Sequence, residues 1–246
     1  MGLTLTVLGC SGGYAGPGNA CSGYLVDDGV THVWVDCGPG TLANLQQHIG
    51  LEDIDALVLS HDHPDHWLEL PVLRNALKYG SGREGLPVYG TAATLAKLEH
   101  LVDELAPTVD WHTVDDGDRF AVADLAFRCS RTDHPVPTLA LRVEAVGNPA
   151  LLYTADTGSA WSPAPLGGGI GLALVEATLS ADQEDDGAHV HLSGRQAGVL
   201  ARQAGAARLL LTHLWPTSDP DERRHEAEAT FGGPVEVAQI HQRYEV

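Results

Sequence analysis

The chain has 246 residues, 43% of them hydrophobic, so it can bury a substantial core in one large domain or two small ones. Its 14 lysines and arginines are outnumbered by 33 aspartates and glutamates, which gives a net charge of −19. Because proteins bind the phosphate backbone mainly through lysine and arginine, this charge disfavours a long RNA or DNA partner, and no local basic patch offsets it.

The first half of the chain predicts strands with intervening helices. Residues 3–9 (LTLTVLG) alternate as a strand, a glycine-rich loop follows, and GYLVDD with THVWVDCG predicts a hairpin. Residues 41–50 predict a helix that stops at a glycine, and the apolar run 56–60 (ALVLS) predicts a strand buried on both faces. A helix over HWLELPVLRNALKYG, with Pro71 near its start or bending it, a strand over LPVYG and a helix over TAATLAKLEHLVDEL follow.

The second half predicts three successive strands, over FAVADLAFRCSRT, TLALRVEAV and ALLYTAD. The strands GLALVEA and ARLLLTHL then alternate with the helices SGRQAGVLARQAG and DPDERRHEAEATF, and VEVAQI closes the chain. No sharp linker interrupts the chain, so we expect a single domain over residues 1–246. Strand groups flanked by helices predict an α/β (α+β) fold in which two mixed sheets pack face to face with helices outside.

The composition also predicts the state of the cysteines and the cellular compartment of the protein. Four widely spaced cysteines without a CxxC pair are expected to be buried free thiols rather than a disulfide framework. No run of about 18 apolar residues could cross a membrane, and the first residues lack the basic and apolar regions of a signal peptide. We therefore expect a cytoplasmic protein without a membrane partner.

A cluster of polar residues follows the buried run 56–60 directly. In LSHDHPDHWLEL, His61, His63, Asp65 and His66 form the pattern H-x-H-x-D-H. In a tight turn this spacing can direct some side chains to one metal and the others to a second, and imidazole and carboxylate suit zinc and other first-row divalent ions. A solvated loop, or a helix cap by Asp65, is the alternative. The ordering favours metal binding.

Three further residues of the same types fall at predicted strand ends. They are His134 in RTDHPVP, Asp156 in LLYTADTG and His213 in LLLTHLWP. A single histidine at a strand end is more often structural than a ligand. Strand ends of a rigid scaffold can, however, bring ligands to a common site, so together the three complete two coordination sets.

This order of motifs, over essentially the whole chain, resembles the metallo-β-lactamase superfamily. The resemblance implies a four-layer αββα sandwich with a two-metal site. Carried over residue by residue, the ligands of one metal are His61, His63 and His134. Those of the other are Asp65, His66 and His213, with Asp156 bridging the two. Asp62 is not a ligand in this pattern and is expected to contribute a local hydrogen bond or charge.

The C-terminal third resembles the ribonuclease Z-like phosphodiesterase group of that superfamily, in which a glutamate pairs with a histidine shortly before the last ligand strand. Glu176 in VEAT and His191 in HLSG match this pair. The resemblance implies that Glu176 orients His191 near the metals, where it can stabilise or protonate a leaving oxygen. Without the resemblance, His191 would be a surface residue at a helix start. His189 is expected to be a bystander.

The chain departs from ribonuclease Z itself. That enzyme carries a tRNA-gripping arm between the third-motif histidine and the bridging aspartate, whereas His134 to Asp156 here is a short hairpin. The net charge of −19 also argues against a tRNA substrate. LGCSGG near the start and HLSG…LLLTH near the end are similar to compact bacterial members that look like cyclic-nucleotide phosphodiesterases.

These features predict a metal-dependent hydrolase: a binuclear phosphodiesterase of small phosphodiesters such as 3′,5′-cAMP, acting by attack of a metal-bridged hydroxide that Asp65 orients. The expected cofactors are two divalent ions, zinc first, with manganese or iron as alternatives. A tRNA 3′-processing endonuclease, a lactone, ester or thioester hydrolase, and a non-catalytic metal-binding protein stay open, as does a homodimer. It also stays open whether Trp67, Trp161 and Trp215 line a pocket or pack in the core.

Overall fold

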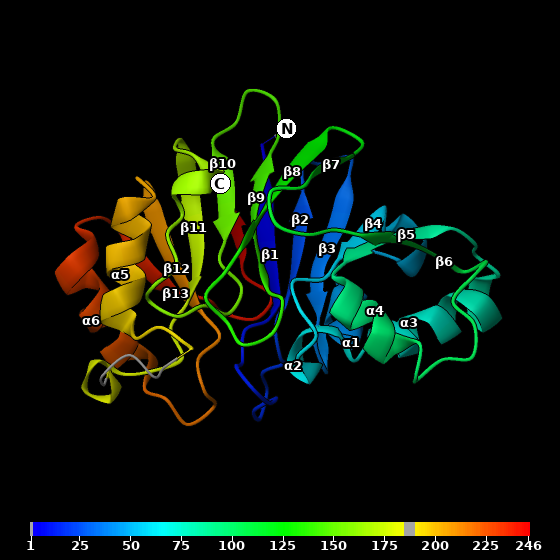
Figure 1. Cartoon of the computed structure of the whole chain (residues 1–246), viewed down its shortest axis with the longest axis horizontal. Helices are drawn as coiled ribbons and strands as arrows, with labels where there is room; N and C mark the ends of the chain where they lie inside the picture. The colour runs from blue at the N-terminus through cyan, green and yellow to red at the C-terminus, as the bar shows by residue number, and fades with distance from the viewer. Residues whose placement is uncertain (1, 185–189) are drawn as a thin grey trace.

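The computed structural model describes residues 2–184 and 190–246, and Figure 1 shows two β-sheets packed face to face between outer helices. The first sheet has the order β14-β1-β2-β3-β4-β5-β6. Its strands are β1 (Thr4–Gly9), β2 (Gly23–Asp27), β3 (His32–Cys37), β4 (Ala56–Val58), β5 (Leu86–Gly90), β6 (Val109–Thr113) and β14 (Arg243–Glu245). The sheet is mixed, since β1 to β3 are antiparallel and β3 to β6 are parallel.

The second sheet has the order β13-β12-β11-β10-β9-β8-β7. Its strands are β7 (Arg119–Val122), β8 (Leu125–Arg131), β9 (Leu139–Glu144), β10 (Ala150–Tyr153), β11 (Ile170–Glu176), β12 (Arg208–Thr212) and β13 (Val235–Val237). Strands β7 to β10 are antiparallel, and β10 to β13 are parallel. The predicted pair of mixed sheets with helices outside is confirmed.

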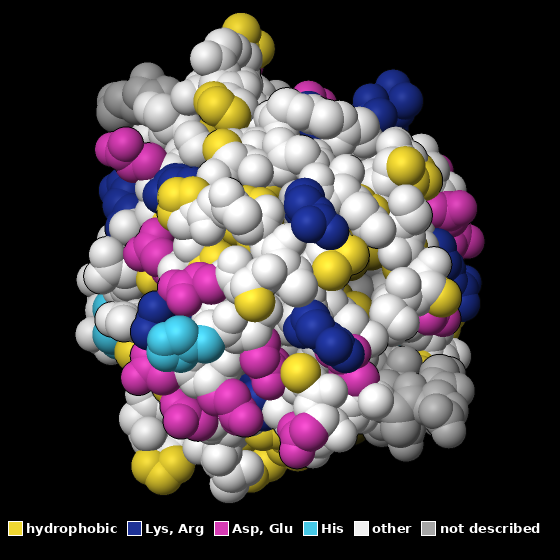
Figure 2. Space-filling model, turned by 90° about the vertical axis from the view of Figure 1, so that its left-hand side faces the viewer, with side chains coloured by type: hydrophobic (Ala, Val, Ile, Leu, Met, Phe, Trp, Pro, Cys, Tyr) yellow, Lys and Arg dark blue, Asp and Glu magenta, His cyan; other side chains and the backbone are white. Residues whose placement is uncertain are grey.

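The helices cover the two outer faces. The first sheet carries α1 (Thr41–Leu45), α2 (Pro64–Trp67), α3 (Leu70–Asn75), the π-helical turn η2 (Ala76–Ser81) and α4 (Ala92–Leu98), with the turn η1 (Leu51–Asp53). The second carries α5 (Gly194–Gln203) and α6 (Pro220–Phe231), with η3 (Ala164–Leu166) and η4 (Ala181–Gln183). Figure 2 shows the face on the side of α5 and α6, where the lysine and arginine side chains are scattered and acidic side chains gather in the lower part of the view. No helix of the described residues is long and apolar enough to cross a membrane.

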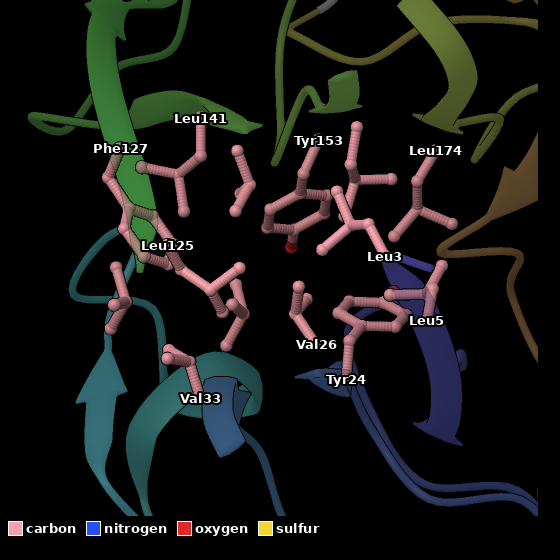
Figure 3. Close-up of a cluster of buried hydrophobic side chains, with 14 of the residues drawn as sticks. Leu3, Leu5, Tyr24, Val26, Val33, Leu125, Phe127, Leu141, Tyr153 and Leu174 are labelled. Atoms are coloured by element: carbon pink, nitrogen blue, oxygen red, sulfur yellow. The ribbon is translucent and has the colours of Figure 1, made fainter. Parts of the chain in front are cut away.

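Alternation along the strands explains why the sandwich has three apolar layers. In β11, Leu172 and Leu174 face the other sheet, whereas Ala173 and Val175 face the outer helices. Figure 3 shows the inner layer, in which Tyr24 and Tyr153 approach each other from opposite sheets with ring centroids 5.2 Å apart. A strand buried on both faces reads as a continuous apolar run, which is why these strands were predictable.

Several predicted boundaries were wrong. The helix expected over 41–50 ends at Leu45, and the helix expected after the metal motif is divided into α2, α3 and η2, with Pro71 in the first turn of α3. The run FAVADLAFRCSRT is not one strand but the hairpin β7–β8, which turns at Ala123 with φ of 47°. Strands β6 and β14 were not expected, because both lie at sheet edges and have few buried apolar residues.

Candidate metal centre

All seven residues of the two predicted coordination sets meet at one edge of the sandwich. His61 and His63 follow β4, and Asp65 and His66 lie in α2, which Figure 1 shows at the lower edge. The others follow strands of the second sheet: His134 after β8, Asp156 after β10 and His213 after β12. The ends of parallel neighbouring strands point to the same edge, so residues far apart in sequence converge there.

The structure divides these residues into two groups, as the sequence predicted. Ligand atoms of His61, His63, His134 and Asp156 all lie within 4.8 Å of one another, and so do those of Asp65, His66 and His213. Asp156 reaches both groups. Its Oδ2 lies 3.5 Å from His61 Nε2, and its Oδ1 lies 3.4 Å from the Nε2 atoms of both His66 and His213. One carboxylate thus faces each group with a different oxygen, which is the placement expected of a bridging ligand.

The imidazole rings are held from behind by hydrogen bonds at Nδ1. His66 Nδ1 donates to Asp36 Oδ2 at 2.8 Å, and His134 Nδ1 donates to the carbonyl of Val190 at 3.1 Å. Since the Thr178 hydroxyl donates to Glu176, it must accept from His213 Nδ1, at 2.9 Å. These protonation states are inferred from the hydrogen-bond network. Such partners fix the tautomer so that each Nε2 lone pair is free to face a metal.

Two buried atoms in the centre support the interpretation that it binds a metal ion. Within the described part of the chain, His61 Nε2 and Asp156 Oδ1 have no hydrogen-bond partner, although both residues are buried. Leaving such atoms unpaired costs free energy. Behind the ring, Ser60 donates to Asp36 and therefore accepts from His61 Nδ1, so His61 Nε2 carries a lone pair. A divalent cation would satisfy both orphan atoms, and the histidine–carboxylate set suits one.

Burial and the crowding of charges shift the pKa values at the centre. Burial lowers the pKa of His61 to about 4, which keeps that ring neutral, as a metal ligand must be. Burial would raise the pKa of Asp156, but the surrounding histidines, His213 first, hold it well below its usual value. Burial would also lower the pKa of His66, but the carboxylates near it, Asp156 first, raise it. The raised pKa means that the His66 ring holds an extra proton when no metal is bound, and a bound cation would take the place of that proton.

Three residues at strand ends beside the centre have left-handed backbone. Asp36 has φ of 54°, Ala155 of 51° and His213 of 57°. Non-glycine residues in this region cost of order 1–3 kcal/mol and persist where the surrounding structure holds them, often at functional sites. Asp36 is the next-to-last residue of β3, whereas Ala155 and His213 follow the ends of β10 and β12.

The predicted Glu176–His191 pair is present. Glu176 is buried at the end of β11, and its Oε1 accepts from His191 Nδ1 at 2.9 Å. Glu176 also accepts from the backbone N–H groups of Thr157 and Leu192, at 2.8 and 3.2 Å. Burial would lower the pKa of His191, but Glu176 outweighs it and raises the pKa to about 9. His191 also lies close to Asp156 and His213, in a third group whose ligand atoms are within 4.8 Å of one another.

Sequence reasoning missed the residues that hold the rings. Asp36 accepts four hydrogen bonds, from Ser60 N–H, Ser60 Oγ, His66 Nδ1 and the Tyr153 hydroxyl. Its position at the end of β3 was a usable signal. Thr178 lies two residues after Glu176 and gave none. The backbone N–H of Gly13 donates to Asp65 Oδ2 at 2.8 Å, which explains one role of the glycine-rich loop.

Other singled-out residues lie away from the centre. Asp62 Oδ2 forms an ion pair with Lys97 Nζ at 2.7 Å, in agreement with the local charge that was expected of this residue. Asp65 is in the first turn of α2 and not its N-cap, which is His63, so the capping alternative was wrong. Trp67 and Trp161 are buried in the outer apolar layers, whereas Trp215 is exposed. All four cysteines are free and buried, and His189 falls outside the described residues.

A family model described as "Beta-lactamase superfamily domain" matches residues 31–214. The chain belongs to the beta-lactamase superfamily. Its relatives in this superfamily include the "Probable metallo-hydrolase YhfI" of Bacillus subtilis, 34% identical over 96% of this chain and 97% of that one. The crystal structure of YhfI covers 100% of both chains with a TM-score of 0.92. The "Ribonuclease Z" of Methanopyrus kandleri is 27% identical over 96% of this chain and 94% of that protein.

These findings confirm the expected superfamily and its ribonuclease Z-like branch, and they make the chain a metal-dependent hydrolase. Another relative, "Uncharacterized protein Rv1339" of Mycobacterium tuberculosis, is 33% identical over 100% of this chain and 93% of that one. The histidine–aspartate cluster is the metal-binding feature of this superfamily member.

Proposed function

We propose that the protein is a binuclear metal-dependent phosphodiesterase of small phosphodiesters, most specifically of a cyclic nucleotide such as 3′,5′-cAMP. The observation that carries the proposal is the buried Glu176 hydrogen-bonded to His191 beside the seven-residue cluster. A lactone, ester or thioester hydrolase could use the same cluster but has no need of this pair.

The cluster would hold two divalent cations, zinc first, with manganese or iron as alternatives. His61, His63 and His134 would bind one, Asp65, His66 and His213 the other, and Asp156 both. When bound, such ions lower the pKa of water toward ~7 and offset the charge of the phosphodiester. Asp65 Oδ2 accepts from the backbone N–H of Gly13, which holds the carboxylate in place to orient an attacking water.

His191 would supply the proton for the leaving 3′-oxygen. Its Nδ1 is engaged by Glu176, and its side chain is 23% exposed, so Nε2 is the ring nitrogen available to substrate. The Glu176 carboxylate favours the protonated ring, which could then donate from Nε2 as the P–O bond breaks. Glu176 stabilises the charged ring before transfer and keeps it in place afterwards.

The nearness of His191 to Asp156 and His213 also allows His191 to be a metal ligand. His191→Asn separates the two roles, because asparagine keeps a donor near Glu176 but has no titratable ring. For a general acid, we expect unchanged metal content and turnover of 3′,5′-cAMP slowed about 10²–10⁴-fold. Loss of a metal in the variant would make His191 a ligand, and an unchanged rate would remove it from the mechanism.

A tRNA 3′-processing endonuclease is the second candidate, supported by the similarity to ribonuclease Z. Against it, β9 and β10 form an antiparallel hairpin joined by only the residues 145–149, which leaves no room for an arm between His134 and Asp156. The face in Figure 2 also has no continuous basic area in view, and Arg224 of α6 pairs with Asp221 and Glu228. Hydrolysis of 3′,5′-cAMP by zinc- or manganese-loaded protein, beside cleavage and band-shift assays with precursor tRNA, decides between them.

A further inference from the structure

A cavity of about 320 Å³ lies beside the candidate metal centre and contains none of its seven residues. Its wall includes both neighbours of His213, Thr212 and Leu214, and also Ser11. A Cβ on Gly12, the residue after Ser11, would lie 2.8 Å from His213 Nδ1. The loop that lines the cavity therefore packs directly on the ring of a proposed ligand, so the cavity and the cluster are neighbours.

The cavity suits an uncharged group. All of its lining side chains that the structure describes are uncharged, in a chain whose net charge is −19. Most are apolar, with a few hydroxyl and amide groups, which is the usual composition of a small-molecule pocket. A phosphate has no counter-charge there, whereas a flat heterocycle with a polar edge matches the lining.

Ser11 gives the cavity an unused hydrogen-bonding group. The residue is 1% exposed, and its Oγ has no hydrogen-bond partner among the described residues. A Cβ on Gly16, which also lines the cavity, would meet Pro216 at 2.9 Å and the Ser11 hydroxyl at 3.7 Å. Glycine at position 16 allows its backbone to pack closely against Pro216 beside this hydroxyl. A polar ligand edge would satisfy the hydroxyl, since buried polar groups are normally paired.

Two exposed aromatic rings lie beside the loop that contacts the metal centre. Trp215 lines the cavity, is 41% exposed, and lies with its ring centroid 5.8 Å from that of Tyr14, which is 47% exposed. A Cβ on Gly13 would touch the Trp215 ring at 3.4 Å, and the N–H of the same Gly13 donates to Asp65. Aromatic rings placed in this way are the surfaces on which nucleic-acid bases stack.

We propose that Trp215 and Ser11 bind the base of a nucleotide whose phosphate lies at the metal centre, with Trp215 stacking on the base and Ser11 meeting its polar edge. The inference rests on the proposed phosphodiesterase function and names the residues that would bind the base of its nucleotide substrate. In a nucleotide the uncharged base and the charged phosphate are joined through one sugar, and here an uncharged cavity adjoins a metal-binding cluster, with Thr212 and Leu214 on either side of His213 in its wall.

The test compares a nucleotide with its base-free counterpart. Affinities of the zinc-loaded protein for adenosine 5′-monophosphate and ribose 5-phosphate are measured by calorimetry, since neither is a phosphodiester that the protein would consume. Trp215→Ala should reduce the preference for the nucleotide by roughly 5- to 150-fold, and Trp215→Phe by less, because phenylalanine still stacks. Ser11→Ala should weaken nucleotide binding roughly 2- to 10-fold. Tyr79→Ala, which removes an exposed aromatic ring in η2, should leave the preference unchanged.

An unchanged preference in Trp215→Ala, or equal affinity of the wild-type protein for both compounds, would overturn the inference. Hydrolysis of 3′,5′-cAMP is measured separately. Turnover without any base preference would keep the phosphodiesterase and reject the base site. A base preference that Trp215→Ala abolishes, in a protein that hydrolyses no phosphodiester, would reject the phosphodiesterase and keep the base site.

Discussion

The ion pair between Glu176 and His191 should make the stability of the metal-free protein depend on pH. The pKa of His191 is raised from its usual 6.5 to about 9. At ~1.4 kcal/mol per pKa unit, this rise corresponds to about 3 kcal/mol of stabilisation by the protonated ring. Because the folded pKa lies above the unfolded one, the contribution is complete below about pH 6.5 and is lost as pH rises through about 9.

The measurement is the free energy of unfolding in chelator, at pH values from 6 to 10, for the wild-type protein and for His191→Asn. Subtracting the free energy of unfolding of the variant from that of the wild-type protein cancels the contribution of every other titrating group. We expect this difference to fall by about 3 kcal/mol across the range, with NMR of the wild-type protein showing His191 titrating near pH 9. A difference that stays flat from pH 6 to 10, with His191 titrating below pH 7, would refute the reasoning.

Three further predictions concern the residues around the cluster. Asp156→Asn should lower the metal content per chain measured by elemental analysis, from the proposed two ions to one or none, because Asp156 faces both groups, whereas Asp124→Asn in an exposed turn should leave it unchanged. Asp36→Ala should destabilise the protein to denaturant by at least about 3 kcal/mol, since it leaves the donors of Ser60, His66 and Tyr153 buried without an acceptor. Asp55→Ala, at the surface, should cost about 1 kcal/mol or less, and equal costs would contradict the role of Asp36. Gly12→Ala should weaken zinc binding in a titration, because the added Cβ would lie 2.5 Å from the His213 carbonyl, while Gly168→Ala, which meets nothing within 4 Å, should bind zinc normally.

Many of the residues that converge at the candidate metal centre could be predicted from local sequence. H-x-H-x-D-H after an apolar run, and single His or Asp residues after later apolar runs, indicate strand ends, and strand ends of a layered fold share an edge. Strands β4, β11 and β12 are buried on both faces, so they could be predicted from their continuous apolar runs. Edge strands such as β6 and β14 have no such pattern, because solvent covers part of each and the composition there is free to be polar.

Only the tertiary structure decided how the cluster is held and what lies beside it. Asp36 meets His66 from 30 positions away and Tyr153 from 117, and no local pattern encodes which donors one buried carboxylate will accept. Asp156 could be matched to a bridging role by its motif, but its two oxygens face different groups only because β10 ends between β9 and β11. The cavity at Trp215 forms where the loop after β1 meets the loops after β12 and β13. Sequence spacing determines which chemical groups reach a strand end, whereas long-range packing determines which of their atoms face one another.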